Sequence, residues 1–334
     1  MCHLIYTDTF YMKRKWIRWV SWILLTPIIL FVILMVLLYV PPVQNLLRRE
    51  VTAYASKVTG MQIQVERIDL RFPLNLLVRG VEVIQQPDTL LSLESLNVRV
   101  QAWPLIKGKV EVDEVTLSRV AVNSADLMEG MKIKGVLGRF FLQSHGVDLS
   151  NELAVINQVE LSDTHVQLLM NDTTTTPKDT TASAPINWKV ALHQLKLKNV
   201  SFGMQLPADS MRMTAHIGEA AIDDAQADLK NQYYDLKKFL LSGTSASYDT
   251  GTAQPTEGFD ASHIAVRDIR IALDSLLYKG RDMNAVIREF TMNERSGLSV
   301  TSLTGRAYSN DSVICVPGLK LNTPHSEIDL SAHT

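Results

Sequence analysis

The sequence contains little of what stabilises small secreted proteins. Among its 334 residues are only two cysteines, Cys2 and Cys315, so we expect a fold that does not depend on disulfide bonds. Cys315 lies in an apolar, strand-like pattern, and we expect it to be an inert thiol in the core.

Motifs that mark catalytic or cofactor-binding sites are also missing. The sequence has no HExxH, CxxC, GxSxG or phosphate-loop motif and no glycine-rich dinucleotide fingerprint. Its eight histidines are scattered without the spacing of metal ligands. Adjacent carboxylates such as Asp223 and Asp224 point to opposite faces of a regular strand and cannot act together on one substrate atom. The sequence therefore predicts a protein that is not an enzyme and holds no metal or cofactor.

Positive charge is not in excess. Lysine and arginine number 33 against 35 aspartates and glutamates, and residues 41–334 carry 29 basic and 34 acidic side chains, a net charge of −5. Nucleic-acid-binding proteins need a basic face that neutralises phosphates. We therefore expect no nucleic-acid partner.

Apolar residues, in contrast, are concentrated near the N-terminus. Between Val20 and Val40, 18 of 21 residues are apolar. A helix of this length extends about 31 Å, enough to cross a hydrocarbon core of about 30 Å. The run is too long for a cleaved signal peptide, and no small-residue cleavage site follows it. Residues 20–40 are thus predicted to be an uncleaved transmembrane signal anchor.

The flanking charges predict the orientation of this anchor. A basic cluster precedes the span, so residues 1–19 are expected in the cytoplasm. Residues 1–11 do not resemble such a segment, and the pattern favours Met12 as the natural start. Tryptophans on the entry side suit the headgroup region of the bilayer. The expected anchor residues are Lys13, Arg14, Lys15, Trp16, Arg18, Trp19 and Trp22.

An amphipathic helix is predicted directly after the span, over residues 43–60. Apolar residues recur at helical spacing from Val43 to Val58, and Gly60 is typical of a helix C-cap. Two roles are compatible with this helix: a lid near the bilayer, or a cover on the end of a sheet.

Beyond Gly60 one apolar spacing dominates, with residues at offsets 0, 2, 5 and 7. In a helix these four positions would share no face, whereas each half of the pattern alternates as a strand does. Copies of this pattern begin at Ile63, Leu76, Leu91, Val110, Ala154, Val190, Ala215, Ile264, Ala285 and Ile314.

The alternation shifts by one residue in the middle of each copy, and two structures would account for the shift. A two-residue hairpin needs turn residues such as Asn-Gly, but the intervening pairs are mostly polar or charged, and only Pro317-Gly318 resembles a turn. A β-bulge needs no such residues and lets both apolar pairs face one side. We therefore predict a mainly β fold in which bulged strands curl an elongated antiparallel sheet over residues 61–334.

Two glycine-containing stretches lack the pattern and are predicted to connect strands. Residues 123–139 and 241–258 are expected to form long loops, with a short helix before the second over residues 227–240. The other turn and loop segments between copies of the pattern are typical of an antiparallel meander.

Residues 172–185 form a threonine-rich segment that is too poor in apolar residues to pack. They are predicted to be a flexible loop or linker. Within it, Thr173 and Thr180 each follow an aspartate in a short motif that resembles the O-glycosylation acceptor of exported Bacteroidetes proteins, so we expect them to be candidate glycosylation sites.

A sheet with one apolar face leaves two interpretations of that face open. It is either an open groove that holds hydrocarbon or the inner side of a sandwich with a filled core. The residues that would line a lipid groove are Ile63, Val65, Ile68, Leu70, Leu91, Leu93, Leu96, Val98, Val110, Val112, Val115, Leu117, Val190, Leu192, Leu195, Leu197, Ile264, Val266, Ile269 and Ile271.

Three segments together resemble the AsmA-like family. They are the anchor with its following helix, residues 62–70, and residues 104–122, in which Pro-Leu-x-x-Gly precedes an alternating strand. The resemblance extends from Lys13 to the end of the chain and is strongest to TamB-type translocation and assembly module proteins in a Bacteroidetes-like version. Members of this type are longer and end in a domain that meets an outer-membrane barrel, so we interpret this chain as an N-terminal fragment.

The resemblance implies an envelope-spanning β-groove that carries phospholipid from the inner to the outer membrane without catalysis. It would be anchored in the bacterial inner membrane with its bulk in the periplasm. The implied partners are phospholipids and, through the missing C-terminal part, an outer-membrane barrel of the Omp85 type that is similar to TamA. The resemblance favours the groove over the sandwich. A second hypothesis is a scaffold that assists the insertion of outer-membrane β-barrels or autotransporters by pairing with their strands.

Overall fold

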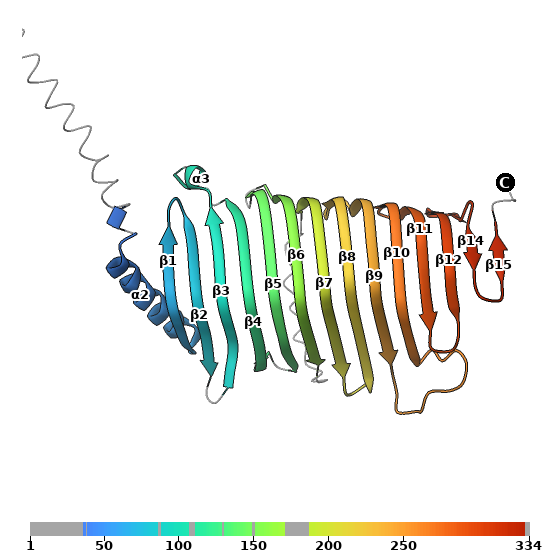
Figure 1. Cartoon of the computed structure of the whole chain (residues 1–334), viewed down its shortest axis with the longest axis horizontal. Helices are drawn as coiled ribbons and strands as arrows, with labels where there is room; N and C mark the ends of the chain where they lie inside the picture. The colour runs from blue at the N-terminus through green and yellow to red at the C-terminus, as the bar shows by residue number, and fades with distance from the viewer. Residues whose placement is uncertain are drawn as a thin grey trace, which may run out of the picture.

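One open β-sheet contains almost all of the residues that the structure describes. The structure is a computed structural model, and it describes residues 36–37, 39–85, 88–106, 111–128, 130–148, 151–170 and 187–330. The sheet has 15 strands, and β1 to β12 lie side by side in the order of the sequence (Figure 1). The chain is therefore mainly β, as the sequence predicts.

The strands are longest in the middle of the sheet, where β4 to β10 contain 17 or 18 residues each. Their length reflects the repeated pattern, which joins two or more apolar pairs into one extended segment. The bounds are β1 Gln62–Arg71, β2 Asn75–Gln85, β3 Asp88–Val100, β4 Val112–Met128, β5 Met131–Asp148, β6 Leu153–Met170, β7 Lys189–Leu206, β8 Met211–Asp228, β9 Tyr233–Asp249, β10 His263–Lys279, β11 Asp282–Glu294, β12 Ser299–Ser309, β13 Ile314–Cys315, β14 Lys320–Asn322 and β15 Glu327–Asp329.

Neighbouring strands are antiparallel with one exception. β6 and β7 run parallel, from Leu153 beside Lys189 to Leu169 beside Gln205. The expected antiparallel meander is therefore wrong at this point. Residues 171–188 connect these two strands. The predicted threonine-rich segment at 172–185, with both candidate glycosylation sites, falls in this connection and lies outside the described residues.

The shift in alternation is an interruption within a strand, as predicted, and not a hairpin. Val65 pairs with Val81 and Arg67 with Arg79, while Glu66 and Gly80 between them make no ladder pair. The same gap recurs at the same level in each following strand up to β9, so the register is kept on both sides of it there, whereas the pairings of β10, β11 and β12 contain register shifts at this level. We call these positions the interruption row; they are Glu66, Gly80, Glu94, Arg119, Gly138, Asp163, Asn199, Gly218 and Gly243.

Several residues of the interruption row have left-handed backbone conformations. Arg119 has a φ of 46°, Asp163 of 51° and Asn199 of 53°. Asp and Asn tolerate this region better than most residues, because their short polar side chains form local hydrogen bonds. The Asn199 amide donates to the Asp163 carboxylate across the row at 2.8 Å. Interruptions of this kind bend and twist a strand, and the strands in Figure 1 are visibly curved.

A turn occurs at Pro317-Gly318, as the sequence indicated, but it does not form a hairpin, because the chain runs in the same direction before and after it. Gly318 has a φ of 66°, and the turn separates β13 from β14, which both pair with β12. Cys315 lies in the two-residue strand β13 and is exposed. The prediction of an inert core thiol is therefore wrong, because this short edge strand has no layer packed over it to bury the side chain.

The predicted connections at 123–139 and 241–258 are largely strands. β4 and β5 occupy most of the first, β9 continues into the second, and the predicted helix at 227–240 consists of the end of β8, a turn and the start of β9. Gly138 was one of the glycines that led to the prediction of a loop, but it lies within β5. A Cβ atom there would lie 2.9 Å from the Asp163 carbonyl oxygen, so glycine permits the close approach of β6.

The helix after the expected span is present as α2, Pro41–Thr59. Gly60 is its C-cap, with a φ of 69°, as the sequence predicts, but the helix begins at Pro41 and not at the predicted residue 43, because proline fits the first turn of a helix. α2 lies against β1 at the edge of the sheet (Figure 1), so it covers this edge. The other helix whose bounds the described residues give is α3, Ala102–Ile106, which is short.

Neither α2 nor α3 is apolar enough over a sufficient length to cross a bilayer, a statement that applies to the described residues alone. The predicted anchor at 20–40 and its flanking residues Lys13 to Trp22 fall outside them, apart from residues 36, 37, 39 and 40 at the end of the span.

Candidate functional site

The candidate site is one face of the sheet, along which apolar side chains continue from strand to strand. Ile68 pairs with Val78, which pairs with Leu96, and each further partner up to β12 is also apolar. Cross-strand partners lie on the same face. We call this line the apolar row; it contains Ile68, Val78, Leu96, Leu117, Phe140, Leu161, Leu197, Ala220, Leu241, Ile271, Phe290 and Leu303.

The apolar row crosses twelve strands without a polar residue. With strands about 4.8 Å apart, its eleven steps span about 53 Å. Parallel lines of apolar pairs accompany it, for example Leu195 beside Val159 and Ile222. The aligned interruptions maintain these lines, because every strand shifts its alternation at the same level.

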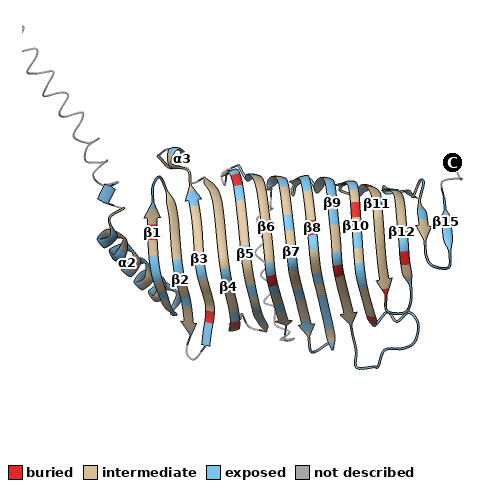
Figure 2. Cartoon of the chain, viewed as in Figure 1, coloured by how far each residue is buried: buried red, intermediate tan, exposed pale blue. Residues whose placement is uncertain are grey.

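Within the described part of the chain, no filled core lies on the apolar face. No large side chain among the described residues is fully buried, and the buried positions are isolated spots on the strands (Figure 2). All described strands belong to one sheet, and the contacts of α2 with the sheet are with the edge strand β1. The part of the chain described here therefore has no second layer of a sandwich.

The predicted groove residues share these properties. Val110 lies outside the described residues, and all the others are in β1, β3, β4, β7 or β10 and are half-buried. Their cross-strand partners are apolar in most cases, as for Leu93 beside Val81 and Val120. The sequence pattern thus identified residues of one shared face.

Three strands of the same face were missed by the pattern: β5, β9 and β12. β5 contributes Phe140 and Leu142 after Gly135, β9 contributes Phe239 and Leu241 before Thr244, and β12 contributes Leu303 before Gly305. All three follow the 0, 2, 5, 7 spacing, but glycine or threonine occupies one of the four positions. Accepting one small residue per copy would have found them.

The opposite face is polar. Lys196 alternates with Leu195 and pairs with Glu160, and Arg99 forms a cross-strand ion pair with Glu114 at 3.2 Å. A cavity of 590 Å³ has side chains of this face in its lining, including His165 and His216. The lining also contains apolar residues that alternate with these, such as Phe202 and Met213, so the cavity is not assigned to one face.

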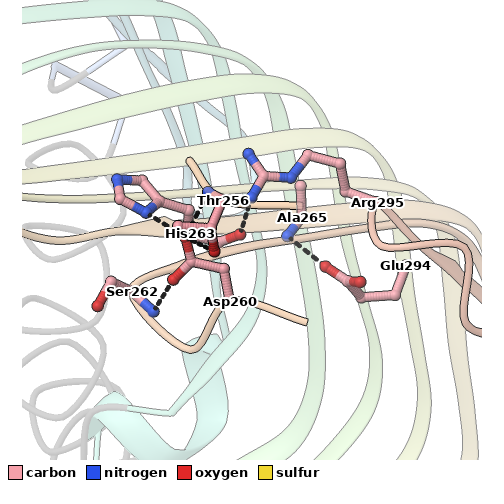
Figure 3. Close-up of polar contacts among 7 residues, drawn as sticks. All are labelled: Thr256, Asp260, Ser262, His263, Ala265, Glu294 and Arg295. Carbon is pink, nitrogen blue, oxygen red and sulfur yellow. Dashed lines mark hydrogen bonds and ion pairs between the residues drawn. The ribbon is translucent and has the colours of Figure 1, made fainter. Parts of the chain in front are cut away.

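A separate polar cluster fixes the connection before β10 (Figure 3). The Asp260 carboxylate accepts hydrogen bonds from the backbone N–H of Thr256 at 3.1 Å and of Ser262 at 2.9 Å, and it lies 3.0 Å from the His263 ring. These contacts, with the Thr256 N–H first, hold the pKa of Asp260 well below its ordinary value. The Glu294 carboxylate accepts from the Ala265 N–H, and hydrogen bonds from Ser296 lower its pKa in the same way.

This cluster is suited to holding the loop and not to proton transfer. Both carboxylates remain ionised near neutral pH, and their oxygens already accept hydrogen bonds from the backbone of residues 256–296. The Arg295 guanidinium, directly after β11, donates to the His263 carbonyl oxygen at 2.9 Å and so connects the end of β11 to the start of β10.

Neither a protein-family model nor a curated protein matches this chain. The resemblance to the AsmA-like family remains an expectation from the sequence, so the function has to be argued from the sheet itself.

Proposed function

We propose that this protein is a non-catalytic conduit for phospholipid, anchored in the bacterial inner membrane, whose apolar face forms a groove for acyl chains on the way to the outer membrane. The observation that carries the proposal is the apolar row. It crosses twelve strands with side chains that water still reaches, and the described residues place no layer over it. Continuous exposed apolar surface of this extent is typical of a binding surface.

The interruption row supports a curled sheet. It interrupts each strand from β1 to β9 at one level, and interruptions of this kind bend a strand. Small residues are buried on both faces of the sheet. Thr164, Ala220 and Thr244 lie on the apolar face and are less than a tenth exposed, and Ala272, beside Leu240 on the opposite face, is 0% exposed.

The energetics favour lipid as the occupant. Moving a methylene group from water to an apolar surface is worth about 0.8 kcal/mol, so an acyl chain with about 15 methylenes would lose about 12 kcal/mol if it entered water. A continuous apolar face replaces the bilayer as solvent, while the charged headgroup stays in water. Transport then needs no covalent step and no catalytic residue.

Photo-crosslinking tests the proposal with two adjacent positions. A benzophenone amino acid replaces Leu195, whose partners Val159 and Ile222 lie on the apolar face, and in a matched variant it replaces Lys196, whose partners Glu160 and Ala221 lie on the opposite face. After illumination of the full chain in cells, radiolabelled phospholipid should be captured at position 195 and not at 196. Equal capture at both positions would overturn the conduit.

A charge in the same place provides a second test. Leu195→Arg should impair the outer-membrane barrier, because a guanidinium on the apolar face costs several kcal/mol to desolvate. Lys196→Arg preserves the charge of the polar face and should have no effect. Detergent sensitivity of cells that express each variant at equal levels gives the readout.

A scaffold for outer-membrane β-barrel proteins is the second candidate. The exposed edge of the sheet at β15 favours it. α2 covers the β1 edge, whereas the far side consists of short strands, and β15 is exposed along its whole length. An open edge can pair with a strand of another protein. Crosslinking from Ile328 to a nascent barrel protein, with no lipid captured at Leu195, would favour this function over the conduit.

A further inference from the structure

α2 seals the first edge of the sheet with polar side chains. Gln44 donates to the Leu70 carbonyl oxygen at 2.9 Å, and Arg48 donates to the Glu66 carbonyl oxygen at 2.7 Å and more weakly to that of Val65. The Ser56 hydroxyl accepts from the Ile63 N–H at 3.1 Å. These groups satisfy the backbone of β1 on the side where no strand follows.

The residues that make these contacts lie on one stripe of the helix. Gln44, Arg48 and Ser56 share this stripe with Thr52, which makes none of these contacts, and all four are spaced by four residues on a single face. All four are half-buried. An amphipathic helix ordinarily turns its apolar side to the sheet, and α2 does the reverse.

The apolar side of α2 points away from the protein as a result. Helical geometry places Leu46, Leu47, Val51, Tyr54 and Val58 within an arc of about 140° that faces away from the polar stripe, and the exposed Glu50 and Lys57 lie in the same arc between Leu46 and Tyr54. Each of these side chains is exposed, Tyr54 by 71% and Val58 by 66%. Five large apolar side chains on one face of a helix of 19 residues, about five turns, are more than scattered surface residues.

The turn between β1 and β2 extends this surface at the start of the helix. Phe72 is 85% exposed, and its ring lies 6.3 Å from that of Tyr39. The Tyr39 hydroxyl donates to the Pro73 carbonyl oxygen at 2.5 Å, which ties the entry of α2 to this turn. We call Leu46, Leu47, Val51, Tyr54, Val58 and Phe72 together the α2 surface.

We propose that the α2 surface binds the lipid–water interface of the membrane. Pro41, the first residue of α2, directly follows the apolar run Val20–Val40. A chain that leaves a bilayer at residue 40 has α2 at the headgroup level, where a helix with one apolar face lies in the plane of the interface. This inference depends on the membrane anchor in the proposed function and not on lipid transport.

The position of α2 in the molecule agrees with this occupant. In Figure 1, α2 lies at the β1 end of the row of strands, and its side away from β1 is the end of the described structure. With the α2 surface on the membrane, the strands would follow one another away from the bilayer. The apolar row would then begin next to the lipid.

Fluorescence quenching in nanodiscs tests the contact. The full chain carries Cys2→Ser and Cys315→Ser and is reconstituted, one copy per disc, into phosphatidylethanolamine and phosphatidylglycerol. A single cysteine with an environment-sensitive fluorophore replaces Leu47 or Tyr54. The matched control position is Ile314, an apolar residue that is 81% exposed in β13, near the other end of the sheet. Lipids with a spin label near the headgroup act as quenchers.

Quenching at positions 47 and 54 should exceed quenching at 314 by at least threefold. Equal quenching at the three positions would overturn the proposal. So would a fluorescence change at 47 and 54 that appears only when several copies share one vesicle, because the occupant would then be a second chain. Lipid capture at Leu195 is measured separately, so a failed quenching experiment with normal capture refutes the α2 surface alone, and the reverse result refutes the conduit alone.

Discussion

Replacing Gly218 with alanine tests whether close packing at the interruption row holds the middle of the sheet together. A Cβ atom at this position would lie 2.8 Å from the Gly243 carbonyl oxygen and 3.0 Å from that of Ser242. Both oxygens belong to the backbone of β9, so the clash is relieved only if β8 and β9 separate. Overpacking of this kind costs about 1–3 kcal/mol.

Gly203→Ala is the matched control in the neighbouring strand β7. Its Cβ would meet only the Gln167 side chain, at the ordinary contact distance of 3.7 Å. Alanine is favoured over glycine within a strand by about 0.5–1 kcal/mol, because glycine loses more backbone freedom on folding. Because both variants gain this contribution, it cancels between them, and they should differ in local stability by the clash alone, about 1–3 kcal/mol, although each adds a single methyl group.

Hydrogen exchange of the full chain, read by mass spectrometry, measures this difference strand by strand. Since 1.4 kcal/mol corresponds to a factor of ten, Gly218→Ala should accelerate exchange of β8 and β9 amides by about 5- to 150-fold. β2 and β3 should be unaffected, because each strand contacts only its neighbours. Equal protection of β8 in the two variants would refute the reasoning, and acceleration in every strand would show that the clash is not local.

Three further predictions concern the edge, a loop and the free thiol. Arg48→Ala removes the guanidinium that donates to β1 and should accelerate hydrogen exchange of β1 by about 5- to 30-fold, for a loss of about 1–2 kcal/mol, whereas Arg49→Ala, at an exposed position, should not. Because the pKa of Asp260 is lowered from 3.8, its ionised form stabilises the 250–262 connection above about pH 4, and this stability should decline as the pH falls further. Asp260→Asn should abolish that acid sensitivity in pH-corrected hydrogen exchange, and an unchanged profile would contradict the prediction. The exposed Cys315 should react with a maleimide in the folded chain within minutes, as peptide mapping would show; labelling that requires denaturant would place the thiol in a buried site after all.

The repeated strand pattern could be predicted because it is local. Period-two alternation with one shift depends only on successive residues, and the pairs between the apolar positions, such as Glu66 and Arg67, have no turn chemistry. The strands, their interruptions and the shared apolar face follow from it. β5, β9 and β12 were not recognised as copies of the pattern. All three strands have its spacing, but Gly135, Thr244 and Gly305 occupy positions where the pattern requires an apolar residue.

The identity of neighbours could not be predicted in the same way. β6 resembles the other strands in sequence, yet its next neighbour runs parallel to it, because pairing direction depends on where the returning chain docks and not on residues within the strand. Cys315 has the apolar surroundings of a core residue in sequence, but β13 has only two residues at the margin of the sheet and cannot bury it.

The same division applies to α2. Its limits are contained in the sequence, since Pro41, Pro42 and Gly60 act on the backbone at their own positions. Its orientation is not, because both of its faces could have met the sheet. The unsatisfied carbonyl groups along the β1 edge bind Gln44 and Arg48, and only this tertiary contact determines that the apolar side faces outward. Local backbone preferences determined the elements of this protein, and the hydrogen-bonding needs of an open sheet edge decided which surface is left for a partner.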